Sequence, residues 1–133
     1  MDWQECKKNG IIKEVKEDVN LIKSTIEVVN IKIESAKALP ENHYIGKITL
    51  LYDSLRGLLE ALSIKKGYKI YNHECYAAFL TEILNLSKEA SSFDSLRRIR
   101  NGINYYGRKL TDEEAEYTLK EINSLINKLK ALI

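Results

Sequence analysis

The sequence predicts an all-α fold, an up-and-down antiparallel bundle of four or five helices formed by a single domain over residues 1–133. Apolar residues recur at spacings of three and four along most of the chain, which is the period of a helix with one buried face. Only one proline, Pro40, interrupts the chain, and strand or turn signals are few. A chain of 133 residues can bury a substantial core without a metal or a disulfide.

The first helix is expected to follow an apolar stripe that ends before Pro40. The residues of this stripe are Ile12, Val15, Val19, Ile22, Ile26, Val29, Ile33 and Ala36. A coiled coil produces this pattern, and so does a bundle helix that packs against its neighbours. We favour the bundle helix because further amphipathic segments follow.

The second helix is expected from about Tyr44 to Ser63. Its buried face consists of Ile48, Leu51, Tyr52, Leu55, Leu58, Leu59 and Leu62. Two lysines followed by Gly67 are typical of a helix C-terminus, where glycine adopts a left-handed turn. Asn72 then suits the N-cap of a third helix. The inward residues of that helix are Tyr76, Phe79, Leu80, Ile83 and Leu84.

A serine joint at Ser91-Ser92 is expected to separate the third helix from a fourth, which runs from Phe93 to Tyr106 and ends at Gly107. Thr111 and Glu114 form the pattern of a capping box that opens the fifth helix. Its apolar positions are Ala115, Leu119, Ile122, Ile126, Leu129 and Ile133. The short connections indicate antiparallel neighbours.

Composition excludes several classes of function. The 21 Lys and Arg nearly balance 19 Asp and Glu, so the net charge of +2 does not by itself indicate nucleic-acid binding. No signal peptide and no membrane span is expected. Cys6 and Cys75 are expected to be free thiols of a cytoplasmic protein. Two histidines and two distant cysteines give no metal-ligand spacing, so neither a metal nor another cofactor is expected.

The fourth helix stands out by its charge. Between Leu96 and Thr111 the chain has five cations and no acid: Arg97, Arg98, Arg100, Arg108 and Lys109. A helical projection places Phe93, Leu96, Ile99, Ile103 and Tyr106 inward, and Arg100, Asn101, Asn104 and Tyr105 on the opposite side. This outward arc is either a solvated face or a site for a phosphate. Arginine binds phosphate oxygens, asparagine binds base edges, and tyrosine offers stacking.

The segment Ser95–Gly107 resembles the signature of the HEPN superfamily, small helical bundles found in ribonuclease toxins and RNA-processing proteins. That signature is an arginine, often followed by asparagine, with a histidine about five positions on; Arg100 and Asn101 match it. The segment Lys66–Cys75 is similar to the link between the second and third helices of archaeal members. The helix order extends the resemblance over nearly the whole chain.

Tyr105 stands where the family has its histidine. The resemblance implies that the arginine stabilises the charged phosphorane and that the histidine assists RNA cleavage. A phenol with a pKa near 10 is a poor base at neutral pH, so this departure favours binding over catalysis. Arg100, Asn101 and Tyr105 are nevertheless the candidate catalytic residues.

Further candidates for substrate binding are Arg97, Asn104, His73 and Glu60. In an up-and-down bundle, the end of the second helix, the start of the third and the end of the fourth are expected at one pole. Glu60, His73 and Tyr105 would meet there, near Arg100. His73 is then either a substitute acid–base group or the anchor of a loop.

Three hypotheses follow. The favoured one is a HEPN-like domain that binds RNA or a nucleotide through Arg100 and Asn101 with little or no catalysis. The alternative is a metal-independent ribonuclease or toxin paired with a minimal nucleotidyltransferase antitoxin, and a further alternative is a structural helical adaptor. The resemblance also implies a homodimer in which the two arginine helices meet across a shared cleft.

Overall fold

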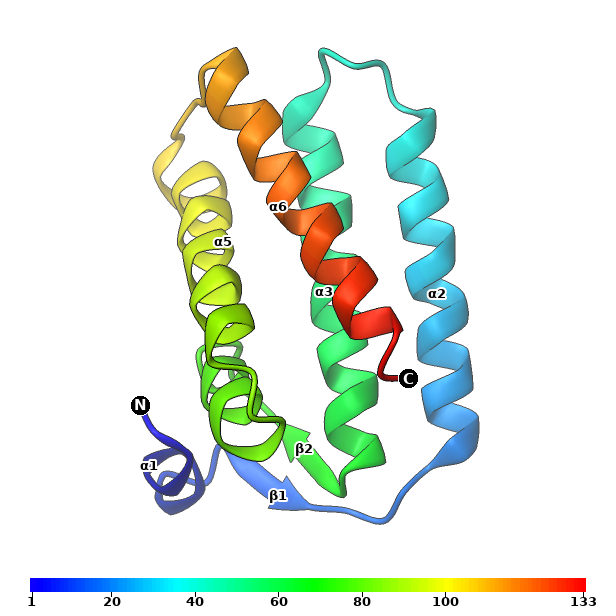
Figure 1. Cartoon of the computed structure of the whole chain (residues 1–133), viewed down its shortest axis with the longest axis vertical. Helices are drawn as coiled ribbons and strands as arrows, with labels where there is room; N and C mark the ends of the chain where they lie inside the picture. Colours follow the sequence, from blue (N-terminus) through cyan, green and yellow to red (C-terminus); the bar gives the residue numbers. More distant parts are fainter.

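The computed structural model describes every residue from 1 to 133 and confirms the all-α bundle (Figure 1). Its four long helices are α2 (Val19–Ala38), α3 (Tyr44–Lys65), α5 (Ser87–Tyr106) and α6 (Asp112–Lys130). They alternate in direction along the chain, so that α2 and α5 run one way and α3 and α6 the other (Figure 1). The central helix is α3, with α6 crossing one of its faces and α2 at the outer edge.

Five short elements close one end of the bundle. They are α1 (Trp3–Lys8), β1 (Ile12–Glu14), β2 (Tyr68–Ile70), α4 (Cys75–Ala78) and the π-helical turn η1 (Phe79–Ile83). The two strands pair antiparallel, with Ile12 opposite Ile70, and both isoleucines are buried in the core. This ladder ties the N-terminal segment to the connection between α3 and α4.

The predicted buried face of the second helix is confirmed. All seven of its residues, from Ile48 to Leu62, are buried in α3. Gly57 lies on the side of α3 that meets α2, where an added Cβ would come within 2.7 Å of Val29 Cγ2. The two helices therefore pack closely because this position has no side chain.

The first helix begins later than the apolar stripe suggested. Ile12 belongs to β1, and α2 starts at Val19, after Asp18 accepts a hydrogen bond from the Leu21 backbone N–H at 3.0 Å. The expected start was wrong because Ile12 and Val15 continue the helical spacing by coincidence. The first N–H groups of a helix have no partner within the helix, and Asp18 accepts a hydrogen bond from one of them, that of Leu21. The aspartate therefore marks the true start of α2.

The expected serine joint is also wrong, because α5 is continuous from Ser87 through Ser91 and Ser92 to Tyr106. The third helix is correspondingly short and consists of α4 and η1. The predicted ends at Gly67 and Gly107 are confirmed by φ angles of 92° and 63°. The capping box at Thr111 is confirmed as well.

The cysteines are not free thiols. Cys6 and Cys75 form a disulfide that joins α1 to α4, with Cα atoms 6.2 Å apart and both side chains fully buried. The sequence could not show this pair, because 69 residues separate the two cysteines and the fold brings them together. Free thiols were one basis for expecting a cytoplasmic protein, and that basis is removed.

Candidate functional site

The centre of the site is Arg100, whose side chain lies between two tyrosine rings. Its guanidinium carbon is 5.3 Å from the centre of the Tyr52 ring on α3 and 5.8 Å from that of Tyr105, one turn further along α5. Nη1 donates a long hydrogen bond of 3.4 Å to Asn101 Oδ1. Nε is buried without any hydrogen-bond partner. Arg100 thus has aromatic neighbours on two sides and no acid.

The other arginines all have acidic partners. Asp94 accepts from Arg97 at 3.0 Å and from Arg98 at 2.9 Å, and Glu114 accepts from Arg108 at 3.2 Å. On α3, Arg56 donates to Glu60 at 3.4 Å. The segment around Arg100 is therefore less basic in the fold than in the sequence, because acids just outside it neutralise its neighbours. Arg100 is the one arginine without a counter-charge.

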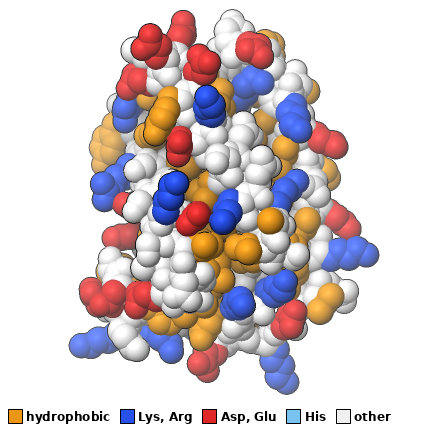
Figure 2. All heavy atoms as spheres, in the orientation of Figure 1, with side chains coloured by type: hydrophobic (Ala, Val, Ile, Leu, Met, Phe, Trp, Pro, Cys, Tyr) orange, Lys and Arg blue, Asp and Glu red, His pale blue; other side chains and the backbone are white.

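The face that carries α6 shows the same balance. Lysine and arginine side chains alternate there with aspartate and glutamate, and no continuous basic patch forms (Figure 2). A general basic surface therefore does not single out nucleic acid on this side of the molecule. An argument for an anionic ligand rests on Arg100 itself.

His73 lies beside the same tyrosine that supports Arg100. The Tyr52 hydroxyl and His73 Nδ1 share a hydrogen bond of 3.3 Å, and the imidazole also packs near Tyr76. Burial, and then the positive charges of Arg56 and Arg100, lower the pKa of His73, so the imidazole is neutral at pH 7. Burial raises the pKa of Tyr52 to about 12, so its hydroxyl stays protonated.

The expected meeting of Glu60, His73 and Tyr105 at one pole was wrong. The C-terminal ends of α3 and α5 lie at opposite ends of the bundle (Figure 1). His73 sits level with Tyr52, roughly 12 Å along α3 from Glu60. The third helix, α4 with η1, is too short to span the length of the bundle. Helix α5 therefore begins near the end where α3 finishes and ends at the opposite end. His73 and Arg100 still come together, through Tyr52.

Glu60 is occupied by structural ion pairs. It accepts from Arg56 at 3.4 Å and also from Lys69 on β2, linking the end of α3 to the small sheet. Arg97 is held in the same way, since its Nε and Nη2 both donate to Asp94 Oδ1. Neither side chain is free in this arrangement to contact a ligand at Arg100 without first breaking a pair.

The polar residues at the end of α5 have different surroundings. Asn104 is exposed, and Tyr105 is 68% exposed with one side of its ring against Arg100. Tyr106 is 84% exposed, so its predicted inward position was wrong: the last turn of α5 has no neighbour to cover it. At Gly102 an added Cβ would lie 3.2 Å from the flexible, exposed Arg108 side chain, so the structure does not require glycine there.

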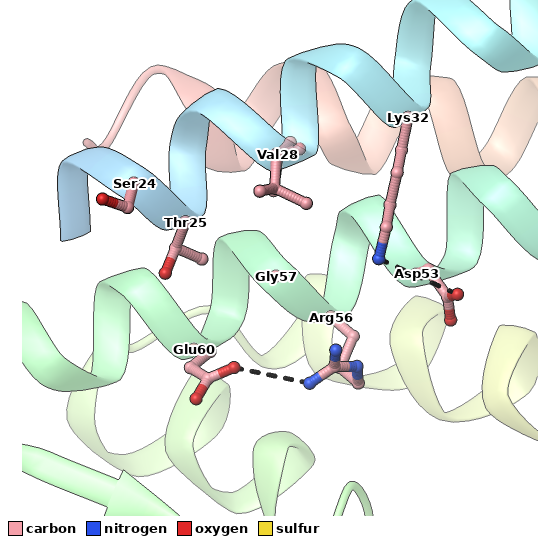
Figure 3. Close-up of a pocket in the computed structure, with 9 residues that line it drawn as sticks. Ser24, Thr25, Val28, Lys32, Asp53, Arg56, Gly57 and Glu60 are labelled. Atoms are coloured by element: carbon pink, nitrogen blue, oxygen red, sulfur yellow. Dashed lines mark hydrogen bonds and ion pairs between the residues drawn. The ribbon is translucent and has the colours of Figure 1, made fainter. Parts of the chain in front are cut away.

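A polar hollow, separate from the surroundings of Arg100, lies between α2 and α3, with a volume of about 220 Å³. Lys32 reaches from α2 toward Asp53 at 4.0 Å, while Arg56 and Glu60 face each other along α3 (Figure 3). These four charges neutralise one another in pairs. The hollow therefore offers no uncompensated charge to a ligand, in contrast to Arg100.

Tyr52 is the residue that the sequence analysis missed as part of the site. Its place in a leucine-rich stripe predicts burial, and burial is observed. Its second role is to hold Arg100 with the ring and His73 with the hydroxyl, and it depends on α5 and the segment before α4 both reaching Tyr52. The only signal in the sequence is the hydroxyl of Tyr52 within a stripe whose other residues are leucine and isoleucine.

The groups around Arg100 have chemistry that suits an oxyanion. A guanidinium without a carboxylate partner attracts phosphate, and the exposed Tyr105 ring beside it can stack on a base. No three acidic, histidine or cysteine side chains gather into a group that could hold a metal ion. None of the helices combines the length and the apolar character needed to cross a membrane.

Comparison of the chain with protein-family models, with curated proteins and with solved structures finds no match in any of the three.

Proposed function

We propose that the chain is a HEPN-like domain that binds RNA or a nucleotide through Arg100, with Asn101 and Tyr105 beside it. The observation that carries the proposal is the missing counter-charge. Four of the five arginines pair with acids of the chain, and the fifth, half-buried between two tyrosine rings, does not. A guanidinium without a carboxylate partner is stabilised by a charge-assisted bond to a phosphate oxygen, which a ligand would supply to the part of Arg100 that is not buried.

Support for RNA rather than a simple anion comes from the residues around Arg100. Tyr105 presents an open aromatic face next to the guanidinium, and a base stacked there leaves its own phosphate within reach of arginine. Asn104 lies exposed one residue before Tyr105 and offers an amide to a base edge or a ribose hydroxyl. Stacking combined with a phosphate contact suits single-stranded RNA.

Binding of a fluorescent single-stranded RNA, followed by anisotropy with a chelator present, tests the proposal. Arg100→Gln is expected to weaken binding by about tenfold or more, since a charge-assisted contact is worth about 1.5–3 kcal/mol. Arg98→Gln is the matched control, because Arg98 lies on the same helix, pairs with Asp94 and is 74% exposed. Equal affinities of the two variants would contradict the proposal.

A metal-independent ribonuclease is a second candidate, favoured by the position of His73. A neutral imidazole beside the phosphate-binding arginine is able to accept a proton from a ribose 2′-hydroxyl. In that case His73→Gln is expected to abolish cleavage of the same RNA and leave its binding within about twofold of the wild type. Absence of cleavage by the wild-type protein eliminates this candidate, and with it the pairing to a nucleotidyltransferase antitoxin.

The resemblance implies a homodimer whose arginine helices meet across a shared cleft, but the proposed ligand binding does not require it. Arg100 receives both of its tyrosine rings from its own chain, so ligand binding at this residue does not depend on how two copies meet.

A further inference from the structure

Helix α2 has a second apolar face that is exposed, and part of it borders the hollow between α2 and α3. Three large side chains on it are exposed: Leu21 by 44%, Val28 by 49% and Ile31 by 62%. The inward face, formed by Val29, Ile33 and Ala36, is buried against the rest of the molecule. Helix α2 lies at the outer edge of the bundle (Figure 1), and its second face stays exposed even where Val28 borders the hollow beside α3 (Figure 3).

The residues of this exposed face have the spacing of a heptad repeat. We call them the α2 seam: Leu21, Ser24, Val28, Ile31, Ser35 and Ala38, spaced alternately by three and four and all exposed. None of the six is charged. Ser35 donates its hydroxyl to the Ile31 carbonyl of its own helix at 3.0 Å, so it adds no unpaired polar group to the seam. The spacing is that of a two-stranded coiled coil, and three of the six positions carry a large apolar side chain.

The residues that flank the seam are polar, and their charges define an orientation. Glu27 borders the seam on one side and Lys32 on the other, five positions later. When two copies of α2 run parallel, Glu27 of each copy lies opposite Lys32 of the other, giving two attractive pairs by symmetry. In an antiparallel pair, Glu27 and Glu34 of one copy would lie near Glu27 and Glu34 of the other, and these like charges would repel.

Lys32 is able to make this pair. Its bond to Asp53 is long, at 4.0 Å, and the side chain keeps 31% of its surface exposed (Figure 3). A partly exposed pair of this length contributes little to stability, so exchanging Asp53 for a glutamate of the second copy costs little.

We propose that the α2 seam binds a second copy of this chain, forming a parallel two-fold dimer along α2. This inference goes beyond ligand binding at Arg100 and does not depend on it. It also differs from a dimer whose arginine helices share a cleft, because α2 and α5 lie at opposite edges of the bundle (Figure 1). Each Arg100 is then open to ligand in its own protomer.

Sedimentation velocity of the full chain over micromolar to submillimolar concentrations tests the proposal. The wild type is expected to shift from the mass of one chain toward that of two. Ile31→Glu is expected to weaken dimerisation by about tenfold or more, since it places two like charges in an apolar seam. Tyr106→Ser is the control on α5, and circular dichroism checks that each variant keeps its helices.

The orientation is tested by exchanging charges. Glu27→Lys alone is expected to weaken dimerisation, since two attractions become two repulsions, and Glu27→Lys with Lys32→Glu is expected to restore it. A wild type that stays a single chain at all concentrations would overturn the proposal. So would a dimer that tolerates Ile31→Glu and is lost in Tyr106→Ser. Failure of the double exchange to restore dimerisation would overturn the parallel arrangement.

Discussion

The guanidinium of Arg100 lies 5.3 Å from the centre of the Tyr52 ring, so a residue of the core determines where the unpaired charge is held. The hydroxyl of the same tyrosine holds His73 at 3.3 Å. Tyr52 therefore joins the two groups on which both candidate functions depend, and its ring and its hydroxyl have separable roles.

Replacing Tyr52 by leucine is expected to weaken RNA binding about tenfold, because a cation–π contact of a partly desolvated guanidinium is worth on the order of 1–2 kcal/mol. Tyr52→Phe keeps the ring and is expected to bind within about twofold of the wild type, while losing ~0.5–1.5 kcal/mol of stability with the hydroxyl. Anisotropy and urea denaturation measure the two effects. Equal loss of affinity in both variants would show that the ring does not position Arg100.

The free energy of unfolding is expected to fall as pH drops below the ordinary pKa of histidine. Burial lowers the pKa of His73 in the folded protein, so between the folded and unfolded pKa values the unfolded chain binds more protons. Stability from a neutral His73 is therefore fully present above about pH 6.5 and is lost as pH falls toward the folded pKa.

His73→Gln is expected to flatten this part of the pH dependence. Urea denaturation of both proteins at a series of pH values measures it, and the imidazole can be followed directly by NMR titration. Parallel curves for the two proteins, or an imidazole that titrates above its ordinary value, would contradict the burial of a neutral His73.

The disulfide between Cys6 and Cys75 is expected to contribute about 2–4 kcal/mol to stability, because it closes a long loop in the unfolded chain. Cys6→Ala with Cys75→Ala is expected to lower the free energy of unfolding by that amount, since both positions are buried and alanine leaves no polar group there. Thiol counting of the unreduced wild type in denaturant is the check. Two reactive thiols would show that the bond is absent.

Gly57→Ala is expected to destabilise the protein, although alanine favours helices. Its Cβ would approach Val29 Cγ2 to 2.7 Å, and the resulting strain exceeds the gain in helix propensity, for a net loss on the order of 1 kcal/mol. In a Val29→Ala background the same substitution is expected to cost less, because the clashing methyl group is gone. A double-mutant cycle by urea denaturation measures this coupling, and additive effects would be evidence against a contact between these two positions.

The three-four spacing of apolar residues predicted the fold because every long helix buries an apolar stripe, and the central helix α3 buries residues on its other sides as well. The seven predicted residues of α3 and the capping box at Thr111 are observed, since both depend on neighbours within a few positions of the chain. Boundaries failed where a short-range signal was ambiguous. Val15 fits a helical stripe, yet its N–H bonds the Gly67 carbonyl at the edge of the small sheet.

The site was harder to predict because its decisive features depend on residues far apart in the sequence. Arg100 was identified from its place on the fourth helix, but nothing near it indicated that Tyr52, 48 residues earlier, lies beneath it. The pairing of Asp94 with Arg97 and Arg98 follows from helical spacing and was within reach of the sequence. Asp94 was left out because the charges were counted only from Leu96 to Thr111.

The central claim is that Arg100 lacks a counter-charge in the protein and obtains one from a ligand. The most direct test follows the Nε–H resonances of the arginines by NMR during titration with a short single-stranded RNA. We expect the Arg100 signal to shift selectively and to saturate, while the signals of Arg97, Arg98 and Arg108, each held by a carboxylate, stay in place. An unchanged Arg100 signal at saturating RNA, or equal shifts of all arginines, would contradict the claim.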